Sequence, residues 1–259
     1  MQLRRLTKYL LEKYPLEDKE DWDPSGFSVK FNLSEKITGI VVGIDLTKEV
    51  LDKAIETNSN LIITHHPFKW EDDWETEKIN APYKLDFLEI LKEKRINVLC
   101  LHTNFDNQDD GTSYQIVKRL KLESNLVPFD DKYAKIIKWN KDIKSLIKLF
   151  NTNLNLYQFR SNFNEECFLQ NNYNIGILAG SGPIDLANKL SSGYVDLVIT
   201  SDIKWSDWIN YRESKFKILE ISHLDEQVFV YKIYEDLVNK FNNLKISTIF
   251  IDEPYHNVK

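Results

Sequence analysis

The sequence predicts an α/β fold of two lobes with mostly parallel sheets. Apolar runs of strand length alternate with segments of helical period along much of the 259 residues. Such alternation favours parallel strands joined by right-handed crossovers. The chain is long enough for two modest domains. We expect a first lobe at residues 1–122, a second at 123–216, and a closing strand–helix–strand segment at 217–259.

The first lobe is expected to begin with an amphipathic helix. Its apolar residues recur at helical spacing among charged ones: Leu3, Leu6, Leu10 and Tyr14. This segment lacks the uninterrupted apolar core of a signal peptide, so we expect the helix of a mature, cytoplasmic protein. The later elements of the lobe are expected to be strand 40–44, a helix capped by Thr47, strand 61–64, helix 82–94, strand 97–101 and a helix opening at Gly111 and Thr112.

The rest of the chain has the same alternation. We expect an irregular insertion at 161–174, and a helix after strand 197–200 whose Trp205 and Trp208 point inward. The glycine-rich sequence at Gly180 predicts a tight turn. The alternative is a phosphate cradle at the N-terminus of the following helix. The other expected elements are strands 134–139 and 154–159 around helix 143–150, strand 218–221, a long last helix and strand 246–251 at a sheet edge.

Composition argues against several classes of partner and leaves a local basic patch as the alternative. A net charge of -6 gives no general attraction to nucleic acid or to an anionic membrane, and no apolar run reaches membrane-spanning length. The two cysteines, Cys100 and Cys167, form no CxxC pair, so neither a disulfide framework nor a cysteine zinc site is indicated. We therefore expect a reducing compartment and no membrane or nucleic-acid partner.

Two adjacent histidines, His65 and His66, follow the apolar run at 61–64. Pro67 should keep His66 extended, and neighbouring side chains on an extended chain point in opposite directions. The two imidazoles are then poorly placed to chelate one ion, but each can serve one of two neighbouring ions. The alternative is a hydrogen-bonded structural pair.

Recurrence of histidine at strand ends favours the metal interpretation. His102 and His223 also follow apolar runs, and each is followed by a carboxylate, Asp106 or Glu226. Nitrogen and oxygen donors of these types suit divalent transition metals. The three-residue spacing of His223 and Glu226 places both on one face if the final helix already includes His223.

These motifs together resemble a known family. THHP, HTNFD, the GSG turn, ITSDIKW and SHLDE occur in the order seen in the dinuclear-metal proteins called GTP cyclohydrolase I type 2 homologs, the NGG-one-interacting-factor-three-like family. The resemblance covers nearly the whole chain. It implies two α/β lobes with the metal site between them, to which residues 217–259 return, and assembly into a ring-shaped homohexamer.

The resemblance also implies roles for individual residues. It gives His102 a position beside the metal site, in proton transfer or in support of the ligands. The cofactor is then two divalent ions per chain, and zinc, iron, manganese or nickel would suit such ligands. The implied ligands, with a carboxylate bridging the ions, are His65, His66, Asp106, His223 and Glu226.

The chain departs from the family pattern at two places. In the box that contains Asp23 and Gly26, Pro24 replaces the usual Asn and Phe27 the usual Leu. Where family members often carry a further His, this chain has Ser201, Asp202 and Ser206. The resemblance therefore assigns no catalytic residue to this second segment.

The sequence thus predicts a metal-dependent hydrolase that activates water between two metals. Ring opening of GTP is the reaction that the resemblance implies, with a small-molecule substrate such as a nucleotide. The alternative is a non-catalytic metal-binding, metal-insertion or regulatory scaffold protein.

Overall fold

A computed structural model of the protein describes residues 1–164, 166, 168, 169 and 172–258. The chain forms two compact units. Unit 1 contains Met1–Gln108 and Phe229–Ile251, and unit 2 contains Asp109–Val228 and the residues after Ile251. The chain therefore leaves unit 1 after Gln108 and returns to it at Phe229.

These units differ from the expected lobes at their boundaries. Helix α6 (Thr112–Arg119) packs in unit 2, where Ile116 and Val117 share a core with Ile137. The closing segment is divided, because its first strand belongs to unit 2 and its long helix to unit 1. Sequence order alone does not show which sheet an amphipathic helix covers.

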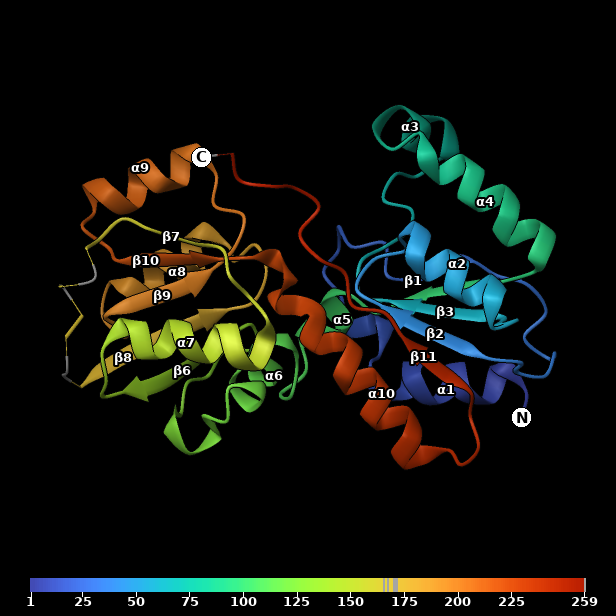
Figure 1. Cartoon of the computed structure of the whole chain (residues 1–259), viewed down its shortest axis with the longest axis horizontal. Helices are drawn as coiled ribbons and strands as arrows, with labels where there is room; N and C mark the ends of the chain where they lie inside the picture. Colours follow the sequence, from blue (N-terminus) through green and yellow to red (C-terminus); the bar gives the residue numbers. More distant parts are fainter. Residues whose placement is uncertain (165, 167, 170–171, 259) are drawn as a thin grey trace. The chain divides into compact units, whose positions relative to one another are not determined.

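Unit 1 is built on a sheet of short strands, of which the three central ones, β2, β3 and β4, are fully buried (Figure 1). Its order is β1 (Gly26–Val29), β4 (Asn97–Cys100), β3 (Leu61–Thr64), β2 (Ile40–Gly43) and β11 (Ile246–Thr248). The strands β4, β3, β2 and β11 are parallel, and β1 is antiparallel to β4. The last strand lies at a sheet edge, as predicted.

Helices cover both faces of this sheet, which explains the continuous apolar strands. Val42 faces the side of α1 (Leu3–Lys13) and α10 (Val228–Lys240), whereas Val41 faces α2 (Lys48–Glu56) and α4 (Tyr83–Lys94). The predicted cap of α2 is confirmed, because the side chain of Thr47 accepts a hydrogen bond from the Val50 N–H at 3.5 Å. A short helix that the sequence did not predict, α3 (Trp74–Asn80), precedes α4.

Unit 2 has a mixed sheet. Among the described residues of this unit, parallel pairing joins only the central strands β8 (Tyr173–Leu178), β9 (Leu197–Thr200) and β10 (Ile218–Ile221). The flanking strands pair antiparallel: β5 (Leu126–Val127), β6 (Ala134–Trp139) and β7 (Phe159–Ser161). The parallel arrangement predicted for both sheets thus holds in the centre of this one.

Helices also cover the two faces of the second sheet. Helices α6 and α7 (Ile143–Leu154) pack on one face. Helices α8 (Ile184–Ser191) and α9 (Trp205–Glu213) pack on the other. Among the described residues, no helix combines the length and the apolar character needed to span a membrane.

Two local predictions in unit 2 are wrong. The strand expected at 154–159 begins later, as β7 at Phe159–Ser161, because α7 continues to Leu154 and ends at Asn155 in the left-handed conformation, with φ of 59°. Trp205 does not point inward, since 80% of its surface is exposed at the start of α9. The irregular insertion expected at 161–174 contains Cys167, and this residue lies outside the described part of the chain.

Candidate metal centre

Three neighbouring parallel strands of unit 1 end at the same edge of the sheet. Gly43 pairs with Thr64, and Thr64 pairs with Cys100, so β2, β3 and β4 finish side by side. Ligand sites in α/β sheets form at such carboxyl ends. The residues that follow these strands are Asp45, the pair His65 and His66, and His102.

The two adjacent histidines converge instead of pointing apart. Both backbone N–H groups donate to the carbonyl of Ile44 at 3.0 Å, so the chain bends directly after β3. The imidazole centroids of His65 and His66 are 5.0 Å apart, with 45° between the planes. The alternation expected from an extended chain is therefore lost, and the two rings can serve one ion as well as two.

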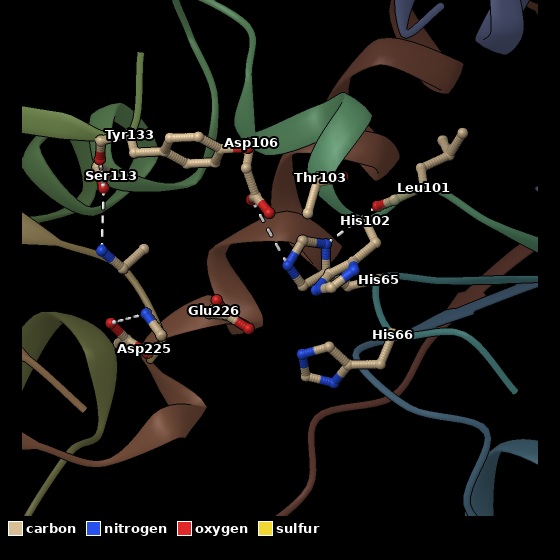
Figure 2. Close-up of polar contacts among 12 residues, drawn as sticks. His65, His66, Leu101, His102, Thr103, Asp106, Ser113, Tyr133, Asp225 and Glu226 are labelled. Atoms are coloured by element: carbon tan, nitrogen blue, oxygen red, sulfur yellow. Dashed lines mark hydrogen bonds and ion pairs between the residues drawn. The ribbon is translucent and has the colours of Figure 1, made fainter. Parts of the chain in front are cut away.

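The ring of His65 is fully buried and oriented by a backbone carbonyl. Its Nδ1 lies 3.0 Å from the carbonyl oxygen of Leu101 (Figure 2). A neutral imidazole that donates from Nδ1 has its lone pair on Nε2. That nitrogen lies 3.6 Å from Oδ1 of Asp106. Two ligands of one tetrahedral ion, each at about 2.1 Å, would be about 3.4 Å apart, so this pair fits a divalent ion.

The other two imidazoles of unit 1 are oriented by carboxylates. Nδ1 of His66 lies 2.9 Å from Oδ1 of Asp45, and Nδ1 of His102 lies 3.2 Å from Oδ1 of Asp23. Carboxylates that hold one ring nitrogen while the other faces a metal are the usual support of metal-binding histidines. One ligand atom from each of the three histidines lies within 4.8 Å of the others. The structure thus brings His102 into the same donor group as His65 and His66.

Asp23 is a buried anion with several donors. It accepts hydrogen bonds from the backbone and side chain of Ser25 and of Thr103. Burial alone would raise the pKa of Asp23, yet these donors, with His102 foremost, hold that pKa well below its usual value. Asp23 therefore remains charged and keeps the ring of His102 in place.

Unit 2 repeats the strand-end arrangement. Parallel pairing of β8, β9 and β10 brings the ends of these strands together, with Ile177 beside Ile199 and Thr200 beside Glu220. The residues that follow are Gly180, the pair Ser201 and Asp202, and His223. The second donor set lies at this edge.

His223 and Glu226 share one short turn. Ser222 caps the 3-10 helix η4 (His223–Gln227), which brings Nε2 of His223 to 2.9 Å from Oε2 of Glu226. Nδ1 of His223 lies 2.7 Å from Oδ2 of Asp202 and 3.2 Å from the hydroxyl of Ser201. The same-face placement predicted from the three-residue spacing is confirmed.

The charges around His223 favour a cation. Burial alone would lower the pKa of His223, but the neighbouring carboxylates, with Glu226 foremost, raise it to about 12. A metal ion that binds this imidazole must displace a proton. The same carboxylates would compensate the charge of the ion.

The glycine turn supports these carboxylates. Gly180 has φ of +57°, and a Cβ built on it would lie 2.0 Å from Oε1 of Glu226. Its N–H donates to Oδ2 of the fully buried Asp225 at 3.2 Å (Figure 2). Burial raises the pKa of Asp225 well above its usual value. The N–H of Gly182 donates to Thr200, so the turn is the tight one that the sequence favoured and these donors do not cradle a phosphate.

Sequence reasoning assigned no supporting role to the carboxylates Asp45 and Asp202. Asp45 lies two residues beyond β2, so the rule that ligands collect at strand ends was a signal that could have found it. Asp202 follows β9 in the same way. The five predicted ligands divide between the units, with His65, His66 and Asp106 in unit 1 and His223 and Glu226 in unit 2.

Comparisons with known proteins agree with the motifs. The family model for Duf34/NIF3 (NGG1p interacting factor 3) matches residues 1–255. A GTP cyclohydrolase 1 type 2 homolog of Mycoplasmopsis pulmonis is 39% identical over 248 residues, 95% of this chain and 97% of the relative. The protein of the same name from Ureaplasma parvum is 30% identical over 92% of this chain and 90% of its own length.

Solved structures share the fold. A Staphylococcus aureus hypothetical protein superimposes with a TM-score of 0.84 at 20% identity, over 100% of this chain and 99% of its own. Reduced HcgD from Methanocaldococcus jannaschii gives a TM-score of 0.78 at 19% identity, over 96% and 97%. At these identities the likeness shows the fold alone.

Proposed function

Because the chain belongs to the Duf34/NIF3 (NGG1p interacting factor 3) family, we propose that it binds up to two divalent metal ions per chain and uses them in hydrolysis. The proposal is carried by the convergence of nitrogen and oxygen donors at the strand ends. The ligands proposed are His65, His66 and Asp106 in unit 1, and His223 and Glu226 in unit 2. Zinc, iron, manganese and nickel all suit such a set.

A divalent ion supplies electrophilic chemistry, because it lowers the pKa of a water ligand and polarises the bond under attack. The chain itself supplies proton transfer through His102. With Nδ1 held by Asp23, the Nε2 atom of His102 can accept a proton from water and return it to the leaving atom. His102 is thus the proposed catalytic residue.

Ring opening of GTP is the leading candidate reaction. It is supported by the name of the relatives, GTP cyclohydrolase 1 type 2 homolog, and by the resemblance of the motifs. The substrate class is then a small molecule with a hydrolysable ring, and a nucleotide is its first example. We also propose a cytoplasmic homohexamer.

A non-catalytic metal-binding or metal-insertion protein, or a regulatory scaffold, is the second candidate. One observation favours it: His102 belongs to the same donor group as His65 and His66. If His102 is a ligand, it can fill a coordination position that a hydrolase needs for water. The ion would then be stored, handed on or structural.

Metal analysis joined to a turnover screen tests the proposal. Gently purified protein should contain more than one equivalent of divalent metal, or reach that value on reconstitution, and should hydrolyse a compound among nucleotides and cyclic amides. His65→Ala should lower both values, whereas the exposed His256→Ala should change neither. Saturation at one equivalent would contradict the two-ion site, and full occupancy without turnover would favour the second candidate.

A further inference from the structure

Two exposed tryptophans lie beside His102 in unit 1. Trp22 is 64% exposed and Trp70 is 42% exposed, although indoles are usually well buried. Their rings are nearly parallel, with 12° between the planes and 6.4 Å between the centroids. The ring of His102 is 5.8 Å from Trp22 and 5.5 Å from Trp70, at 75° and 87°. His102 therefore stands edge-on beside both indoles and not between them.

The backbone that carries Trp70 is fixed by a buried carboxylate. Oε2 of Glu77 accepts hydrogen bonds from the N–H groups of Trp70 and Glu71 at 2.7 and 2.8 Å. Glu77 is buried and pairs with the buried ammonium of Lys84. A buried ion pair thus holds a segment whose tryptophan stays exposed.

Trp22 is anchored in a similar way. The next residue, Asp23, is buried, and its backbone N–H donates to the carbonyl of Glu20 at 3.0 Å. The ammonium of Lys19 donates to the carbonyl of Asp23. Both indoles are therefore presented on fixed backbone, which lowers the entropy lost when a ligand binds.

The geometry suits a flat ring. A ring placed between two parallel rings needs about 7 Å between their planes, which is two contact distances of about 3.5 Å. The indole centroids are 6.4 Å apart, so the gap between the planes is no wider than that and one indole must move outward to admit a ring. Without that movement, Trp22, which is 64% exposed, can still make a one-sided stacking contact.

We propose that Trp22 and Trp70 form a stacking site for a flat heterocyclic ring of about nucleobase size beside His102. A stable protein interface covers roughly 800 Å² on each side, far more than two side chains, so the two indoles by themselves do not indicate a protein partner. As the substrate-binding element next to the proton-transfer residue, the site rests on the proposed function. Its ligand contact involves neither Asp106 nor the donors of unit 2.

Ligand binding to metal-free protein tests the site apart from turnover. Guanosine, adenosine and uridine are titrated while tryptophan fluorescence is followed, and ribose is the non-aromatic control. At least one nucleoside should quench saturably in the millimolar range or below, and ribose should not. Trp70→Leu should weaken binding by about 5-fold or more, since base–aromatic stacking is worth about 5- to 150-fold in affinity. Trp70→Phe keeps a π face and should retain most of the affinity.

The variant Trp205→Leu is the matched control, because Trp205 is also exposed but lies in unit 2. It should bind like the wild type, while Trp22→Leu should bind like Trp70→Leu. Equal affinity of the Leu and Phe variants, or no saturable quenching by any nucleoside, would overturn the stacking site. Fluorescence that changes with protein concentration instead would show that another copy covers the indoles. Metal content measured on the same variants keeps a failure of the stacking site distinct from a failure of the metal site.

Discussion

At the scale of single residues, oxygen atoms that are not proposed as ligands decide which ring nitrogen of each histidine carries the lone pair. The carbonyl of Leu101 and the carboxylates of Asp45 and Asp23 each lie against one Nδ1 atom. A neutral ring that donates from Nδ1 carries its lone pair on Nε2. The supporting oxygens therefore set the donor atom in all three rings of unit 1.

The variant His102→Asn separates proton transfer from metal binding. If His102 transfers a proton, the variant should keep its metal and lose roughly 10²- to 10⁴-fold in turnover, the usual size of such a contribution. Metal content and hydrolysis are measured on the same preparations, with His65→Ala as the ligand control. Loss of metal as complete as in the control would make His102 a ligand. Survival of both properties would make it a structural histidine.

At the scale of elements, the ends of parallel strands carry the donors and short turns orient them. In unit 2 the turn after β8 touches the turn η4 so closely that only glycine fits at position 180. The left-handed φ at this position adds a second reason, because a side chain there costs about 1 kcal/mol or more. The glycine turn is thus part of the support of Glu226.

Gly180→Ala should disturb Glu226 directly. The added methyl group would meet the carboxylate at 2.0 Å, so Glu226 must move. We expect a lower metal content and a loss of about 1 to 3 kcal/mol in the free energy of unfolding. Urea unfolding and elemental analysis measure the two effects. Gly193→Ala is the control, since nothing lies within 4 Å of its added Cβ; equal behaviour of the two variants would contradict this role of Gly180.

The contact between α1 and α10 in unit 1 depends on a buried carboxylate. Asp236 accepts from Lys13 at 2.6 Å, from Lys232 at 3.0 Å and from the hydroxyl of Tyr14. Burial alone would raise the pKa of Asp236, but these donors lower it. A lowered pKa stabilises the folded state above the unfolded value of 3.8, and this stabilisation is lost as the pH falls below it.

Asp236→Asn should therefore destabilise the protein in a pH-dependent way. We expect a loss of about 2 to 3 kcal/mol at neutral pH, below the usual value for a fully buried pair because Lys13 is partly solvated. The difference from the wild type should shrink as the pH falls below 3.8. Urea unfolding of metal-free protein across pH measures this difference. The exposed pair of Lys48 and Asp52 supplies a control, Asp52→Asn, which should change stability by less than about 0.5 kcal/mol; a pH-independent effect of Asp236→Asn would contradict the assignment.

At the scale of the whole molecule, neither unit is one continuous piece of chain. Unit 1 is completed by α10 and β11, which follow all of unit 2's sheet strands. Removal of residues 229–251 would take Phe229 and Ile233 from the core of unit 1 and leave β2 as an unpaired edge. The donors of unit 1 therefore depend on the far end of the chain.

Assembly is the property tested at this scale. We expect a homohexamer in solution, on the resemblance to a family of ring-shaped assemblies. Light scattering at low micromolar concentration gives the mass, which should be six times 30.6 kDa for the chain. Measurement with and without chelator shows whether metal is needed for assembly. A stable monomer in both conditions would contradict the expectation.

Sequence alone determined the local features of this protein. The strands at 61–64 and 97–100, the capped helix after Thr47 and the strand-end positions of His65, His102 and His223 follow from short-range patterns of apolar residues, caps and breakers. Residue types at strand ends were enough to indicate a metal. These signals are local because each depends on neighbours within a few positions.

Tertiary structure alone decided how those features combine. Three of these combinations depend on residues distant in sequence. They are the backbone bend at His65 and His66, the contact of Asp45 with the ring of His66, and the packing of α6 in unit 2. The same is true of Trp22 and Trp70, which are 48 residues apart and stack beside His102. Such contacts come from sheet register and burial, which no short pattern contains, so the positions of the histidines at strand ends were predictable and their arrangement was not.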